Sequence, residues 1–109
     1  MSASFNDAAG ALVGAIRVAF AGAGRFTLEE LVSRAWASVT FSGSRQELAF
    51  RIEGETADAA AAKFLSGLRA AEFPLAGHIL ADIALVSEER RPGYARIRLE
   101  ALTVEDGLV

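Results

Sequence analysis

The chain has 109 residues, no cysteine and a formal net charge of -3. A chain of this length can bury a core as one domain without disulfides, and the lack of cysteine excludes disulfide bridges, thiolate metal sites and cysteine nucleophiles. The acidic balance argues against nucleic-acid binding, which usually needs a basic face. We therefore expect a single domain over residues 1–109, in a reducing cytoplasm.

Apolar residues recur at helical spacing from Ala8 to Gly24, and this spacing predicts a first helix. The stretch is short for a membrane span and carries Arg17 near its middle, so we expect no membrane partner. The other side of this helix is also largely apolar. A helix of this kind is expected to be covered on more than one side.

The next segment carries a helix-start signal and then a strand signal. Thr27 and Glu30 have the spacing of a capping box, with Phe26 and Leu31 placed for a hydrophobic staple, which predicts a short helix. From Trp36 the apolar period changes to two, which is typical of a half-buried strand. We expect a first hairpin over residues 35–53, with its turn at residues 42–45.

A second helix and a second hairpin follow. Thr56 can cap a helix whose apolar stripe leads toward Pro74, where a proline would end it. The strand that begins at His78 should turn within residues 87–94, where Pro92 and Gly93 suit a type II turn. The return strand, over residues 94–102, has the cleanest period-two pattern in the chain.

These elements predict an α+β fold in the order helix, short helix, hairpin, helix, hairpin. Its four-stranded antiparallel sheet should pack one face against the N-terminal helix and the central helix. The sequence leaves the strand order open. The strand over residues 78–86 is apolar on both sides apart from Asp82, which is typical of a central strand. The first helix or a second subunit would then cover its other face, and we favour a homodimer.

The second face of the sheet is expected to carry apolar side chains that could form an interface between subunits or with a protein partner. These interface candidates are Trp36, Leu80, Ala84, Val86 and Leu102.

The same face is expected to carry charged side chains suited to a small anion. Arg51, Arg96 and Arg98 could bind a carboxylate or phosphate if their strands are neighbours. His78, with Asp82, could add acid–base chemistry, but residues four apart in a strand are separated by roughly 13 Å and do not contact directly. We favour the structural alternatives, in which His78 has no chemical role and the arginines pair with carboxylates. Those carboxylates would be Glu53, Asp82 and Glu100.

No segment has the spacing of a nucleophile elbow, a paired-histidine metal site or a phosphate loop, so we assign no catalytic residue, metal or cofactor. The sequence leaves open whether the chain is an enzyme, and favours a non-catalytic protein. The function we expect is an oligomerising or protein-interaction module. The alternative is a small ligand-binding protein or enzyme that holds an anionic molecule with the arginine cluster and His78.

Overall fold

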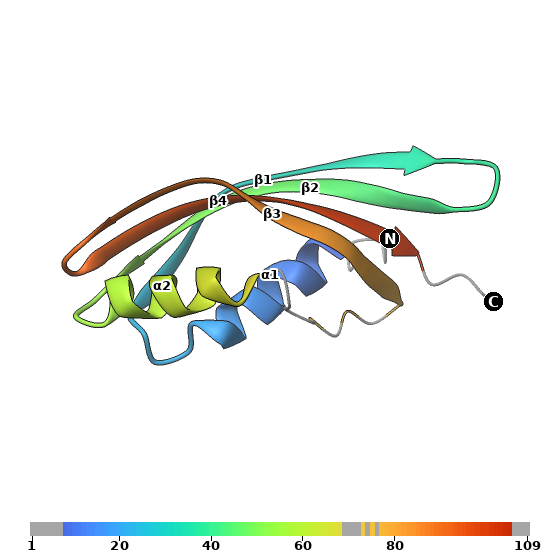
Figure 1. The fold of residues 1–109 in the computed structure, drawn as a ribbon. Helices are drawn as coiled ribbons and strands as arrows, with labels where there is room; N and C mark the ends of the chain where they lie inside the picture. The colour runs from blue at the N-terminus through green and yellow to red at the C-terminus, as the bar shows by residue number, and fades with distance from the viewer. Residues whose placement is uncertain (1–7, 69–72, 74, 76, 106–109) are drawn as a thin grey trace.

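A computed structural model of the chain describes residues 8–68, 73, 75 and 77–105. The elements in chain order are α1 (Ala8–Ala19), β1 (Arg25–Ala37), β2 (Ser42–Glu53), α2 (Ala57–Ser66), β3 (His78–Arg91) and β4 (Tyr94–Glu105). All four strands form one antiparallel sheet in the order β1-β2-β4-β3 (Figure 1). The expected α+β class, with a four-stranded antiparallel sheet, is confirmed.

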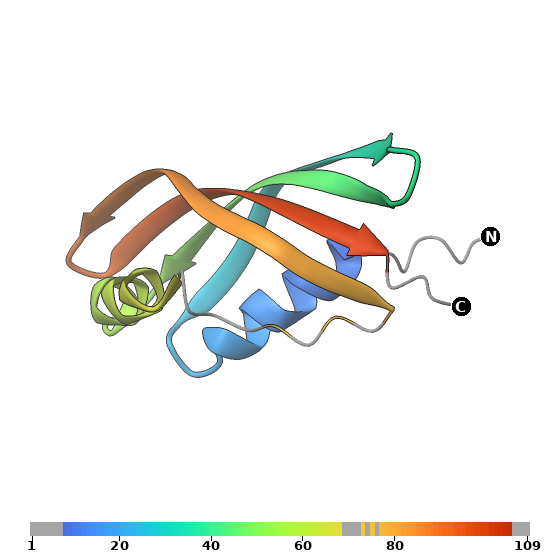
Figure 2. The same ribbon diagram turned by 45° about the vertical axis from the view of Figure 1, so that its right-hand side comes forward.

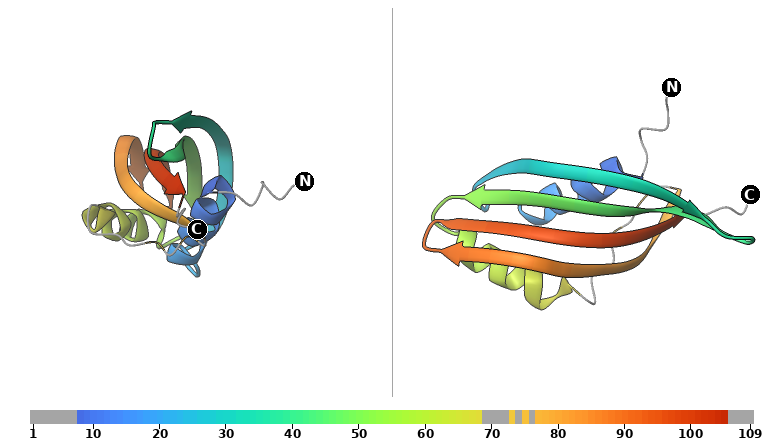
Figure 3. Two further views of the ribbon diagram at one scale, coloured as in Figure 1. Left: turned by 90° about the vertical axis from the view of Figure 1, so that its right-hand side faces the viewer. Right: turned by 90° about the horizontal axis from the view of Figure 1, so that it is seen from above.

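Both described helices lie on the same side of the sheet, which we call the core face (Figures 1 and 3). The opposite side, the outer face, carries neither of them. The first helix therefore does not cover the outer face, which was one of the two possibilities left open by the sequence. Neither described helix, at 12 and 10 residues, has the length and apolar character needed to cross a bilayer.

The core is organised around Phe50 of β2, which is fully buried on the core face. Its ring meets the ring of Phe20, directly after α1, edge to face at 5.5 Å and stacks on Phe26 of β1 at 5.0 Å. Phe64 of α2 contacts both Phe20, at 4.9 Å, and Phe50, at 6.4 Å. Aromatic pairs at these separations add attraction to the burial of their area. Phe50 thus joins both helices and two strands.

Strand β4 follows its period-two pattern throughout. Its odd-numbered residues from Ala95 to Thr103 are buried on the core face, and the even-numbered ones are exposed or half-buried on the outer face. Because β4 lies between β2 and β3, both of its edges are paired and nothing interrupts the alternation. The period-two pattern in the sequence of β4 is regular because β4 is a central strand.

The short helix expected around Phe26–Leu31 is wrong, since these residues belong to strand β1. A bulge shifts the register between Leu28 and Glu30, so that Leu28 pairs with Phe50 but Leu31 pairs with Leu48. Leu28 and Leu31 therefore share the core face at a spacing of three, which imitates one turn of a helix. The bulge removed the period-two signal from the sequence.

The expectation that β3 is central is also wrong, because β3 forms an edge of the sheet. Bulges interrupt its register between Leu80 and Asp82 and again between Leu85 and Ser87. The first bulge turns Leu80 toward the core, where it packs against the buried cluster. Leu80 is therefore not on the outer face, where strict alternation had placed it.

The turn of the first hairpin lies at residues 38–41, four positions earlier than expected. Ser38 closes it, donating its backbone N–H to the carbonyl of Phe41 at 2.7 Å and accepting the Phe41 N–H on Oγ at 3.0 Å. Gly43 lies inside β2, where an added Cβ would stand 2.0 Å from the carbonyl oxygen of Thr103. Gly43 therefore allows the backbones of β2 and β4 to approach closely, and it is not part of the turn.

Two other boundaries differ from the sequence-based ones. Helix α2 ends at Ser66, followed by Gly67, and Pro74, where its end was expected, lies outside the described residues. Strand β3 continues to Arg91, so residues 87–91 are strand and only Pro92 and Gly93 make the turn. Gly93 has φ +78°, the positive value that a type II turn requires there.

Replacing Phe50 by alanine should lower the free energy of unfolding by about 3–5 kcal/mol, because it removes the ring that joins α1, β1 and α2. Urea unfolding followed by circular dichroism measures the change. Val18→Ala, on the exposed side of α1, is the control and should shift stability by less than about 0.5 kcal/mol. If Phe50→Ala fails to fold, Phe50→Leu provides a milder test. A loss no larger than that of the control would contradict the central role of Phe50.

Candidate functional site

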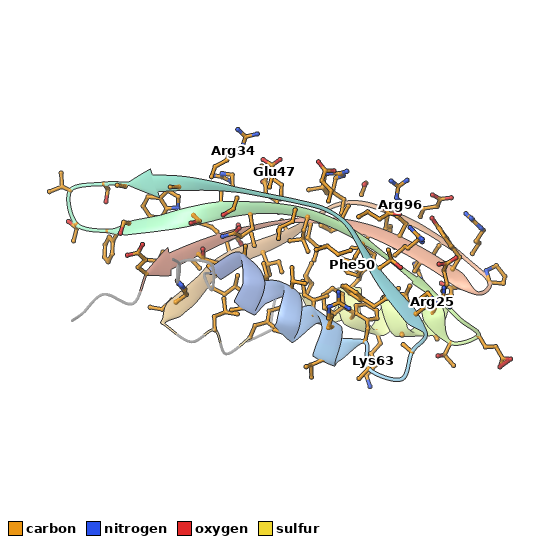
Figure 4. All side chains as sticks on the ribbon, turned by 180° about the vertical axis from the view of Figure 1, so that it is seen from behind. Arg25, Arg34, Glu47, Phe50, Lys63 and Arg96 are labelled. Atoms are coloured by element: carbon orange, nitrogen blue, oxygen red, sulfur yellow. The ribbon has the colours of Figure 1, made fainter. Side chains whose placement is uncertain are left out.

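The three arginines of the expected anion site do come together on the outer face. Strands β2 and β4 are neighbours, and their register places Arg51 directly opposite Arg96 and Ala49 opposite Arg98. Figure 4 shows Arg96 above the sheet, on the side away from the helices, whereas Phe50 lies between the sheet and the helices. The geometric condition for an anion site is therefore met.

Glutamates from β1 occupy the positions that an anion would need. Glu29 accepts hydrogen bonds from Arg51 Nη1 and from Arg96 Nε, both at 2.7 Å. Arg98 Nη2 donates to Glu30 Oε1 at 2.6 Å. We call these five residues the ionic cluster. An external anion would have to displace carboxylates that already neutralise the guanidinium groups.

Glu29 is the centre of this cluster. The hydrogen bond from Arg51 lowers the pKa of Glu29 below its ordinary value, and the hydrogen bond and charge of Arg96 act in the same direction, against partial burial. In return, the hydrogen bond to Glu29 raises the pKa of both Arg51 and Arg96. Charge-assisted hydrogen bonds of this kind keep all three groups ionised.

The sequence pointed to pairing of the arginines but identified only one of the partners. Arg51 does bind Glu53, at 3.1 Å from Nε to Oε1. Glu100 instead lies 3.6 Å from Arg45, and Asp82 forms no ion pair within the described residues. Glu29 and Glu30 were missed because their segment had been interpreted as a helix. The bulge in β1 places both glutamates on the outer face. In the sequence, the bulge is indicated only by the two consecutive glutamates, which interrupt the alternation of polar and apolar residues that begins at Arg25.

The structure does not bring His78 to the arginines. Arg98 lies opposite Ser87, whereas His78 lies opposite Glu105, seven residues farther along β4, or roughly 24 Å at the spacing of an antiparallel strand. Nor does a hydrogen bond link His78 to Asp82 in the described part of the chain, where His78 donates its backbone N–H to the carbonyl of Leu75. Acid–base chemistry by His78 on an anion held by the arginines is not supported by this geometry.

Metal-ligating side chains are also dispersed. Within residues 8–68, 73, 75 and 77–105, no three histidine, aspartate or glutamate side chains gather closely enough to hold an ion.

The interface candidates fall into separate groups. Trp36 and Leu102 line a shallow depression of about 360 Å³ on the outer face, beside Arg34 and Arg45. The indole of Trp36 lies over Gly43, whose added Cβ would stand 3.0 Å from Cζ2. Ala84 and Val86 are exposed on the edge strand β3, and Leu80 faces the core. No single surface unites the five residues.

A larger hollow runs beneath the edge strand. Arg90 near the end of β3 binds Asp58 in the first turn of α2 at 2.9 Å, which fixes that end of the helix under the hairpin of β3 and β4 (Figure 2). Toward its other end α2 leaves a groove of about 840 Å³ against β3. The groove is lined mainly by apolar residues of both elements, namely Leu65, Leu68, Leu80, Ile83 and Leu85.

Replacing Glu29 by glutamine should lower the free energy of unfolding at pH 7 by up to about 1 kcal/mol, the upper range for an exposed ion pair. Because the pKa of Glu29 is lowered in the folded state, its stabilisation is present above the ordinary carboxyl pKa and is lost as the pH falls through the folded pKa. The difference between variant and wild type should therefore shrink between pH 5 and about pH 2. Urea unfolding followed by Trp36 fluorescence measures it.

Glu47→Gln is the matched control, because Glu47 has one longer contact, 3.8 Å from Arg34. Its effect should be smaller. Equal losses for the two variants, or a loss for Glu29→Gln that is independent of pH, would contradict the assigned role of the ionic cluster.

Comparison of the chain with protein-family models, with characterised proteins and with solved structures finds no match. What the chain does is therefore inferred from its own residues. Among those that the structure describes, three features stand out: an outer face of paired charges, an open edge at β3 and an exposed hairpin tip.

Proposed function

We propose that this chain is a non-catalytic module that self-associates through the edge strand β3, in the reducing cytoplasm indicated by the absence of cysteine. The proposal rests on the exposed apolar side chains along this edge. Leu85 and Val86 are 39% and 55% exposed there, and the apolar groove opens directly beneath the strand. An edge strand also presents unpaired backbone donors and acceptors. Apolar side chains and free backbone groups at one place favour a protein partner.

The two edges of the sheet differ in their protection. Strand β1, at the other edge, carries charged residues along its length and a bulge. The first nine residues of β3, from His78 to Val86, contain Asp82 as their only acidic residue and no arginine or lysine. Charges on an edge prevent pairing with other chains. Glu88 to Arg91 charge the rest of β3, so the open part of this edge is its first nine residues, which only Asp82 and the bulges protect.

A small-ligand function has weaker support. The arginines that would hold an anion already bind glutamates, and His78 lies far from them. Among the described residues, nine line the groove, and Asp82 is the one with an ionisable side chain. A protein surface fits such a lining better than a small anion does.

Leu85→Glu should convert a self-associated chain into a monomer, because it places a charge at the open edge. Light scattering across a concentration series measures the mass, which should exceed the 11.5 kDa of one chain for the wild type. Leu31→Glu is the matched control: Leu31 lies on the opposite edge strand with 37% exposure, close to the 39% of Leu85. It should leave the association unchanged.

Circular dichroism would establish that both variants are folded. A wild-type mass of one chain at every concentration would overturn the proposed self-association. Equal disruption by the two variants would show that the interface is not specific to β3.

A further inference from the structure

The tip of the first hairpin is apolar and exposed. Val39 is fully exposed and Phe41 is 58% exposed, although both are residues that usually avoid water. The ten residues from Ala35 to Ser44 contain no charged side chain. We call Val39 and Phe41, with the turn that carries them, the fingertip.

The fingertip projects beyond the core. Gly43 of β2, Val104 of β4 and Ile79 of β3 form the last row of the sheet in which these three strands are paired, and residues 38–41 lie past that row. Figures 1 and 2 show this hairpin extending away from both helices, at the end of the sheet opposite the hairpin of β3 and β4. No described element of the same chain packs over the fingertip.

Two arginines stand at the base of the fingertip, directly opposite each other in the register. Arg34 lies 3.8 Å from Glu47 and Arg45 lies 3.6 Å from Glu100, distances longer than a hydrogen bond. Their side chains are 68% and 50% exposed. Both guanidinium groups therefore keep donors free for an external acceptor.

The groove beneath β3 has the complementary character. Leucine and isoleucine side chains line it beside exposed polar groups, and Asp82, which has no ion pair within the described residues, lines it too. The last turn of α2, with Ser66, forms its other wall. Asp82 is the one charged side chain among the described residues that line the groove. The groove thus combines apolar side chains with one carboxylate that has no ion pair among the described residues.

We propose that the fingertip of one chain inserts into the groove of a second copy, with Arg34 and Arg45 facing Asp82. This inference rests on the proposed self-association and specifies its geometry. Val39 and Phe41 would pack against the leucine and isoleucine side chains of the groove, and the arginines at the base would meet Asp82. The tip and the groove are different surfaces, so the contact is head to tail.

The fingertip cannot reach the groove of its own chain. Ile83, in the middle of the groove, lies in the same row of the sheet as Ala101 and Gln46. The turn that carries Val39 begins beyond Ser42, which is four residues from Gln46, or roughly 14 Å along the strand direction. Head-to-tail contacts between copies close into rings or continue as open chains. The wild-type mass should therefore rise above that of a dimer as concentration increases.

Two variants test the proposal by complementation. The double variant Val39→Ser, Phe41→Ser lacks the fingertip but keeps the groove, and Leu85→Lys places a positive charge in the groove but keeps the fingertip. Each alone should be a monomer of 11.5 kDa by light scattering. Their equimolar mixture should form a dimer of twice that mass and nothing larger, because only one intact tip and one intact groove can meet.

The controls and the contrary outcomes are distinct. Val18→Ser, at a 75% exposed apolar residue of α1, should associate like the wild type. If Leu85→Lys fails to fold, Leu65→Lys, on the α2 side of the groove, replaces it. Normal association of the fingertip variant, or a mixture that stays monomeric, would overturn the head-to-tail contact while leaving self-association through β3 intact. A monomeric wild type would overturn both proposals.

Discussion

The packing of Phe50 against rings from α1, β1 and α2 is the constraint on which the rest of the structure depends. Because this ring draws both helices to the core face, the outer face is left without a described helix above it. A chain of 109 residues has no further helix among its described elements to cover that face. Paired charges make it compatible with water instead, since cross-strand pairs of opposite charge stabilise an exposed sheet face.

Bulges decide where side chains point in both edge strands. In β1 the bulge directs Glu29 and Glu30 to the outer face, where they neutralise the arginines of β2 and β4. In β3 a bulge turns Leu80 into the core. One extra residue in a strand reverses the face of every residue that follows it. The same irregularity therefore builds the ionic cluster at one edge and shapes the groove at the other.

The apolar surface that remains exposed lies at the ends and the edge of the sheet, not on its charged centre. The fingertip and the β3 edge are separate surfaces, and each exposes apolar side chains. The outer-face candidates Trp36 and Leu102 lie beside the base arginines, at the same end of the sheet as the fingertip.

The sequence by itself determined the α+β class, the two hairpins, the helix at Ala57 and the faces of β4, because hydrophobic period and turn residues are local properties. It also indicated that Arg51, Arg96 and Arg98 would be paired. Only the tertiary structure decided the strand order and which strands are edges, since these depend on contacts between residues far apart in the chain. Because of the bulges, β1 was not predicted as a strand and Leu80 was predicted on the wrong face. A bulge can be recognised only from the register with the partner strand, which the sequence does not give. The glutamates that occupy the anion site, and the groove beneath β3, were hidden for the same reason.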